Sequence, residues 1–109
     1  MPDEDHSLTF EIERNGDAAR VKCHGRMLAW GTDTFQQAVK SLLPTTKQIV
    51  IDLADLRFVD SMGLGALVRL YVSARQVGSR LRVEHLGKQV HSVMEITNLL
   101  GILAQPEAA

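Results

Sequence analysis

A serine at the start of a predicted helix is the residue of this chain best placed for chemistry. The stretch Ile49–Leu70, IVIDLADLRFVDSMGLGALVRL, is an apolar β-branched run followed by a loop that ends in Asp60 and Ser61, where the longest helical pattern begins. Ser61 is predicted at the N-cap, where a serine side chain can accept a hydrogen bond from a backbone N–H that has no partner within the helix. A helix N-terminus also carries positive potential and free N–H groups that favour a phosphate. Ser61 is therefore a candidate both for a helix cap and for a phosphorylation site.

Small residues follow this serine. Gly63, Gly65 and Ala66 leave the backbone accessible. Each glycine lowers helix propensity by about 1 kcal/mol, so another interaction must favour it. Close approach by a partner and close packing against a sheet would both explain Gly63.

Helical spacing divides residues 61–77 into two faces. The side expected to pack on a sheet carries Gly63, Leu64, Leu67, Leu70, Tyr71 and Ala74. The opposite side carries Ser61, Met62, Gly65, Ala66, Arg69, Val72, Ser73 and Gln76. Exposed apolar residues beside a modifiable serine suggest a docking surface, although single exposed apolar residues are also normal. The candidate partner-binding residues are Asp60, Met62, Gly63, Gly65, Ala66, Arg69, Val72 and Ser73.

Other chemistries find little support in the sequence. Ser61 has no G-x-S-x-G setting, and the histidines lack metal-ligand spacing. Asp52 could suggest a phosphoaspartate, but the acids at positions 3–5 precede the first strand, so we expect Asp52 to hydrogen-bond the next loop. Cys23 is expected to be a small buried residue. No phosphate-binding loop is present, so ATP would belong to a partner. Because the histidines are scattered and Cys23 is the single cysteine, we expect no metal, and we expect no cofactor.

Length and charge restrict the function further. The chain has 109 residues, and its 12 Lys and Arg nearly balance 13 Asp and Glu. We expect one domain with a core at about 8–103 and tails at 1–7 and 104–109. A nucleic-acid binder needs a basic excess, which is missing here. No apolar run is long enough for a membrane span and the acidic N-terminus is unlike a signal peptide, so we expect a cytoplasmic protein. Because the catalytic motifs are missing, we expect a binding module that is not an enzyme.

Alternating strand and helix patterns define the expected fold. Period-two segments at 8–13 and 19–24, joined by a turn at Asn15 and Gly16, predict an antiparallel hairpin that ends at Gly25. Helices are predicted from a cap at Thr32 or Asp33 to residue 43, and at 61–77 and 88–95, with a last turn at 98–100. Further strands are predicted at 49–53, 80–85 and 102–103. The fold class is α/β: a small mixed sheet, made of the hairpin and parallel strands, with helices packed on it.

The stretch 60–68, DSMGLGALV, resembles the D-S-x-G-L-G-x-L signature of STAS domains, specifically the bacterial anti-sigma factor antagonists. The strand before it, the Phe58-Val59 pair and the position of Gly25 are similar too, so the resemblance covers roughly residues 8–103. It implies a STAS-like fold and binding to an anti-sigma factor that is also an ATP-dependent serine kinase. It further implies that phosphorylation of Ser61 ends this binding and that a phosphatase restores it.

Two departures and two alternatives accompany this resemblance. Met62 follows the serine at a position where smaller residues are frequent in the family. Many antagonists carry an acid shortly after the first glycine, where this chain has Leu28, and this alters the expected partner contacts. The first alternative is a scaffold-type STAS domain in a stress-signalling or lipid-transport complex, with Ser61 only a cap. The second is a small domain that binds a nucleotide or anion at the helix N-terminus.

Overall fold

A β-hairpin begins the part of the chain that the computed structural model describes, residues 8–29 and 31–104. Strand β1 (Leu8–Asn15) pairs antiparallel with β2 (Ala18–Met27). Asn15 pairs with Ala18, so the turn is Gly16 and Asp17, one residue later than predicted, and Gly16 takes the left-handed φ of 67° that the turn requires. Apart from Ala104, the expected tails at 1–7 and 104–109 lie outside the described residues.

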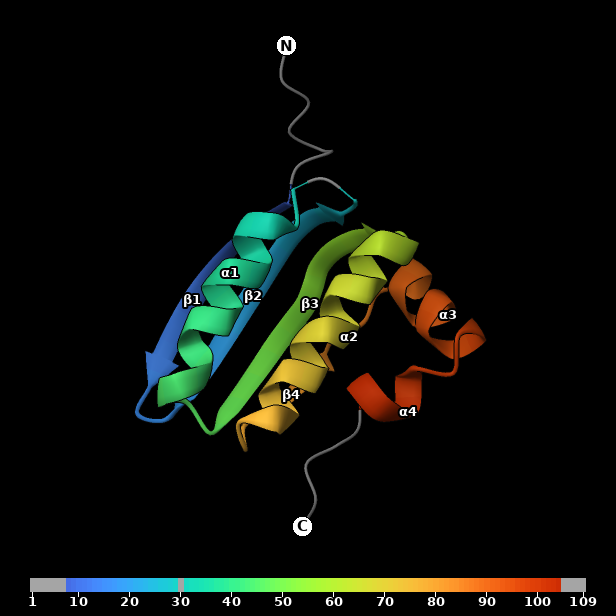
Figure 1. The fold of residues 1–109 in the computed structure, drawn as a ribbon. Coiled ribbons are helices and arrows are strands. Elements are labelled where there is room, and N and C mark those ends of the chain that lie inside the picture. Colours follow the sequence, from blue (N-terminus) through green and yellow to red (C-terminus); the bar gives the residue numbers. More distant parts are fainter. Residues whose placement is uncertain (1–7, 30, 105–109) are drawn as a thin grey trace.

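The described strands form one mixed sheet in the order β1-β2-β3-β4, which confirms the predicted fold class. Strand β3 (Gln48–Val59) runs parallel to both β2 and β4 (Arg80–Glu84). Helix α1 (Asp33–Leu42), with the short 3-10 helix η2 (Leu43–Thr45), leads from β2 to β3, and α2 (Ser61–Gln76) leads from β3 to β4. Crossovers between parallel strands have a fixed hand, so both helices cover the same face of the sheet (Figure 1).

Two short helices complete the described chain beside α2 (Figure 1). Helix α3 (Lys88–Ile96) packs on β3, and α4 (Leu100–Leu103) packs on β4. The predicted strand at 102–103 is wrong, because Asn98 takes a left-handed φ of 63° and the Leu103 N–H bonds to the Leu99 carbonyl 2.9 Å away. None of the described helices is both long and apolar enough to cross a membrane.

Strand β3 extends six residues beyond its predicted end. Its register with β2 shifts between Lys22 and His24 and again between Gly25 and Arg26, so β3 carries extra residues at two bulges. Pairing with β3 also extends β2 to Met27, beyond its predicted end at Gly25. Gly25 itself takes a φ of 94°. Because β3 continues to Val59, one residue, Asp60, separates it from the start of α2.

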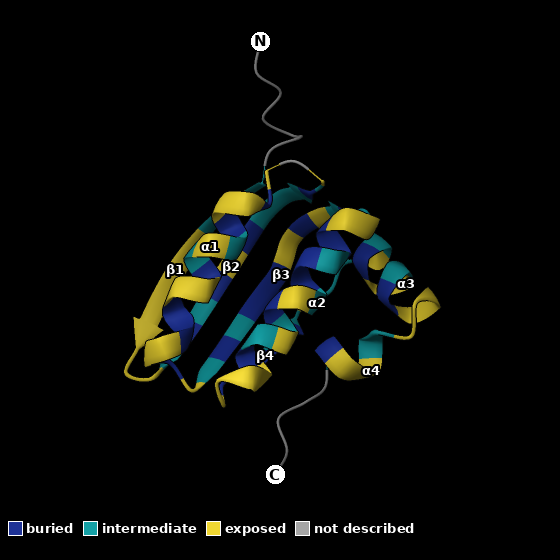
Figure 2. Cartoon of the chain, viewed as in Figure 1, coloured by how far each residue is buried: buried dark blue, intermediate teal, exposed yellow. Residues whose placement is uncertain are grey.

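The core fills the space between the sheet and the two crossover helices (Figure 2). The predicted inward face of β2 is confirmed, since Ala19, Val21 and Cys23 are buried. Fully buried side chains from the other elements pack against it: Phe35, Val39, Ile49, Ile51, Leu53, Leu67, Leu70 and Met94. The ring of Phe10 meets that of Phe35 edge-on at 5.6 Å, which joins β1 to α1.

The opposite face of the sheet carries a network of charged groups. Asp52 is buried in the middle of β3, which continues past the predicted strand at 49–53, and its carboxylate accepts from Arg20, His85 and the Ala54 amide at 3.0 Å each. Arg20 also reaches Glu84 at 2.9 Å, and Arg82 pairs with Glu84. Asp52 is therefore a structural residue that joins three strands and stabilises a bulge.

These contacts predict that stability falls in acid. Burial alone would raise the pKa values of Asp52 and Glu84, but the hydrogen bonds they accept outweigh burial and lower both pKa values. A carboxyl group whose pKa is lower in the folded state than in the unfolded state stabilises the protein at pH values above its unfolded pKa, which is about 4. This stabilisation is lost as the pH falls through the pKa of the folded state. Urea unfolding should therefore show a lower free energy of unfolding at pH 3 than at pH 7. The Asp52→Asn variant should lose part of this difference, whereas Asp17→Asn, in the exposed hairpin turn, should retain it. Equal pH dependence of Asp52→Asn and wild type would contradict this assignment.

Candidate functional site

Asp60 caps helix α2. Its backbone is extended, with φ −97° and ψ −178°, and its Oδ1 accepts from the Gly63 N–H at 2.7 Å. The Asp60 carbonyl accepts the first intrahelical bond, from Leu64, at 2.9 Å. The prediction that Ser61 is the cap is therefore wrong by one residue: Ser61 is the first residue inside the helix. Both residue types are good caps, and only the backbone conformation distinguishes them.

The Ser61 side chain consequently makes no capping hydrogen bond to α2. It is exposed, and its hydroxyl has no hydrogen-bond partner among the described residues. The amides of Ser61 and Met62 open the helix, where no preceding turn supplies a carbonyl. A nucleophilic hydroxyl thus lies at the positive end of a 16-residue helix.

The second carboxylate oxygen of Asp60 ties another loop to this site. Oδ2 accepts from the Ala29 N–H at 3.3 Å, and the Asp60 N–H donates to the Met27 carbonyl at 3.2 Å. Half-buried Leu28, the residue that departs from the family pattern, lies between these two contacts. Asp60 thus brings the end of β2 and the start of α2 together.

Gly63 explains how α2 approaches β2 so closely. A β-carbon at this buried position would overlap the Met27 carbonyl oxygen and lie 2.9 Å from its carbonyl carbon. Close packing, one of the two explanations left open for Gly63, therefore accounts for this glycine, and its predicted place on the sheet-facing side of the helix is confirmed. At half-buried Gly65, a β-carbon would meet only the Arg69 guanidinium, at 3.3 Å, so the Arg69 side chain lies back along the helix toward Ser61.

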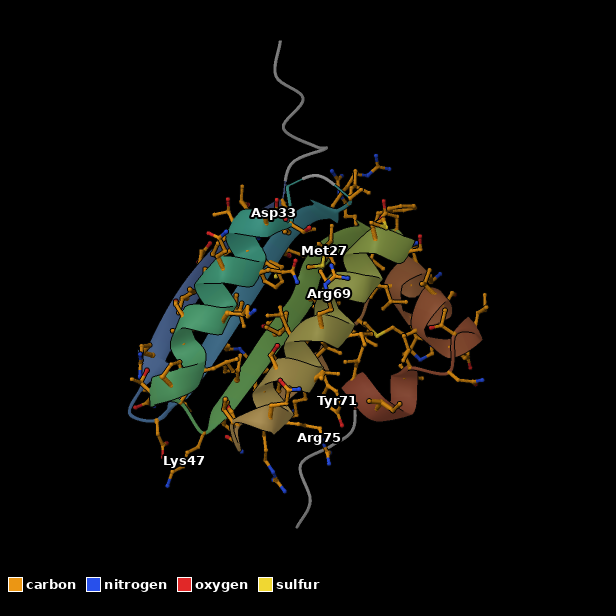
Figure 3. All side chains as sticks on the ribbon, in the orientation of Figure 1. Met27, Asp33, Lys47, Arg69, Tyr71 and Arg75 are labelled. Carbon is orange, nitrogen blue, oxygen red and sulfur yellow. The ribbon has the colours of Figure 1, made fainter. Side chains whose placement is uncertain are left out.

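The outward face of α2 is narrower than predicted. Ala66 is fully buried, which corrects its predicted place on that face, because α2 packs on α1 as well as on the sheet. Met62 is 57% exposed and Val72 is 45% exposed, whereas Ser73 is half-buried. Arg69, labelled in Figure 3, is exposed on the side of α2 that faces α1.

Sequence reasoning missed Gln89 of α3. Its Oε1 accepts from the Val59 N–H at 2.9 Å, and its Nε2 donates to the Val59 carbonyl at 3.0 Å. A side-chain amide thereby completes both backbone hydrogen bonds of the last residue of β3, immediately before Asp60. A lone glutamine carries no sequence pattern that would have identified this role.

The remaining candidates are structural. The two ring nitrogens of His24 each lie 3.0 Å from a carboxylate oxygen, one of Glu11 and the other of Asp55. Burial, with a smaller contribution from the Asp52 charge, raises the pKa of the Cys23 thiol to about 12, which leaves it unreactive. In the part of the chain that the structure describes, no three His, Cys, Asp or Glu side chains are grouped to hold a metal ion.

The identity of the cap predicts different effects for two neighbouring alanine variants. Asp60→Ala removes the cap and the tie to Ala29, and should lower the free energy of unfolding by about 1–2 kcal/mol. Ser61→Ala removes a hydroxyl without a partner, and should change it by less than about 0.5 kcal/mol. Chemical denaturation of both variants measures this difference, and a larger loss for Ser61→Ala would show that the serine is the cap.

The packing of Gly63 predicts a second pair of outcomes. Gly63→Ala should lower the free energy of unfolding by about 1–3 kcal/mol, because the new methyl overlaps backbone atoms that cannot move aside. Gly65→Ala is the matched control in the same helix. It displaces only the end of a flexible arginine and should stabilise by about 0.5–1 kcal/mol through helix propensity. Similar stabilities for the two variants, by chemical denaturation, would contradict the close contact.

Comparison with known proteins identifies the family. The family model described as "Mlab, STAS domain" matches residues 10–104. The anti-sigma-B factor antagonist of Bacillus subtilis (strain 168) is 22% identical over 97 residues, 89% of each chain. The anti-sigma F factor antagonist of Paenibacillus polymyxa is 24% identical over 99 residues, 89% of this chain and 85% of the relative.

Solved structures share the fold. The anti-sigma factor antagonist SpoIIAA in its unphosphorylated form superposes with a TM-score of 0.78 at 16% identity, covering 92% of this chain and 89% of that chain. The Bacillus cell fate determinant SpoIIAA in the phosphorylated form gives a TM-score of 0.73 at 14% identity, covering 92% of both chains. Because the family model extends over almost the whole described chain, this protein belongs to the STAS domain family.

Proposed function

We propose that this chain is an anti-sigma factor antagonist, a cytoplasmic binding protein and not an enzyme. In its unmodified form it binds an anti-sigma factor serine kinase, and phosphorylation of Ser61 ends that binding. The observation that carries the proposal is the Ser61 hydroxyl, which is exposed at the first turn of α2 while Asp60 supplies the cap. The similarity to curated antagonists and to a relative solved in a phosphorylated form supports it.

The position of Ser61 allows a switch that leaves the fold unchanged. A phosphate adds a charge of about −1.5 to −2. At the first helical residue this charge is stabilised by the helix dipole and the free amides. In an interface the same charge opposes binding, and each 1.4 kcal/mol weakens affinity about tenfold.

The proposed docking surface comprises the exposed and half-buried residues around Ser61: Asp60, Met62, Gly65, Arg69, Val72 and Ser73. Gly63 and Ala66 are buried and make no direct contact with the partner in this proposal. Leu28, on the loop that Asp60 holds beside Ser61, gives the partner an apolar side chain where many antagonists present an acid. A phosphatase that restores the Ser61 hydroxyl completes the cycle.

Mass spectrometry tests the modification directly. Trypsin should release the peptide 58–69, in which Ser61 is the single hydroxyl residue. After incubation with ATP and the co-purifying kinase, we expect this peptide to gain one phosphate, and Ser61→Ala to prevent it. An unmodified peptide in the presence of an active, bound kinase would refute the switch and favour a scaffold-type STAS domain. Saturable nucleotide binding without a partner would favour the anion-binding alternative.

A charge-mimicking variant tests the consequence for binding. Ser61→Asp should weaken kinase binding at least about tenfold, because a carboxylate at the interface must lose its water. Ser92→Asp adds the same charge at an exposed serine on α3 and is the matched control. Isothermal titration calorimetry measures both affinities, and equal affinities would contradict the proposed interface.

A further inference from the structure

A groove between α1 and α2 extends the outward face of α2 away from Ser61. Its volume is about 360 Å³. Helix α1 contributes Gln36 and Lys40, and α2 contributes Val68, Arg69, Val72 and Ser73. The two helices lie side by side on the same face of the sheet (Figure 1), and the groove lies between residues 36–40 of α1 and 68–73 of α2. We propose that this groove receives an acidic amphipathic helix of the partner protein.

The charges in the groove determine the chemistry of this occupant. Lys40 and Arg69 line it from opposite helices, and both are exposed. Neither side chain has an ion-pair or hydrogen-bond partner among the described residues. Of the residues that the structure describes, no acidic side chain lines the groove. Two cations without a described counter-charge flank one groove and therefore favour carboxylates on the partner.

Two valines add apolar surface to the lining of the groove. Val68 is half-buried and Val72 is 45% exposed, and both line the groove, so the partner finds apolar surface in the same groove as the two cations. The lining runs from residue 68 to 73 of α2, which corresponds to roughly 8 Å of helix. That length accepts two apolar side chains one helical turn apart, which is how an amphipathic helix presents its apolar face.

Arg69 connects the groove to the phosphorylation site. It lines the groove, while its guanidinium lies over Gly65, one turn from Ser61 on the same stripe of α2. A partner seated in the groove would therefore cover the face that carries Ser61. The inference rests on the proposed function, in that the occupant belongs to the anti-sigma factor kinase.

Charge-neutral variants of the full chain test the groove against the purified kinase encoded in the same genome. Lys40→Gln and Arg69→Gln should each weaken binding about fivefold at low salt, and the effect should shrink in 0.5 M salt because the contacts are electrostatic. Val72→Asp should weaken binding at least about tenfold. Arg75→Gln removes the same charge from α2 outside the groove and should bind within twofold of wild type. Circular dichroism melts should show all four variants folded.

The outcomes separate this inference from the proposed function. Wild-type affinity of the Lys40, Arg69 and Val72 variants would overturn the groove, even if Ser61 is phosphorylated. Weakened binding of those variants would support the groove, even if Ser61→Asp and phosphorylation have no effect. Sedimentation velocity of the chain alone tests a second copy as the occupant. A dimer that Val72→Asp dissociates would overturn the assignment to a partner helix.

Discussion

The carboxylate of Asp60 is the interaction on which the arrangement of the site depends. One oxygen holds the first turn of α2 and the other holds the loop after β2, while the Asp60 amide bonds to the Met27 carbonyl. Backbone groups from two separate elements are thus fixed by one residue. Because the cap is supplied by this neighbour, the Ser61 hydroxyl remains unused by the fold. The residue that holds the helix start is therefore distinct from the exposed serine beside it, and under the proposed function a phosphate on Ser61 would leave the cap in place.

The fold follows from the sequence wherever one simple periodicity holds. The alternation in β1 and β2 and the helical stripes of α1 and α2 predicted those elements to within a few residues. Strand β3 was predicted only to Leu53, because its inward residues change from a spacing of two to a spacing of three, at Leu56 and Val59. Bulges produce that change, and they arise from pairing with β2, which no local pattern records.

The start of α2 was predicted in location but not in detail. The D-S-x-G-L-G stretch identified the correct helix start, yet two adjacent capping residues could be distinguished only by backbone angles. A helical wheel assumes one covering surface, so it placed Ala66 outward although α1 also covers α2. Gln89 escaped notice because its role depends on α3 returning to the end of β3, a contact between residues 30 positions apart.

Gln89 makes the site sensitive to a chemical change outside it. The Gln89 side-chain amide donates one hydrogen bond to the Val59 backbone and accepts one from it. It thereby supplies the two hydrogen bonds that a neighbouring strand would otherwise supply to Val59. Deamidation would convert the donor into a carboxylate oxygen facing the Val59 carbonyl, and two acceptors would then oppose each other. Loss of this one amide would therefore loosen the strand end from which Asp60 positions the helix.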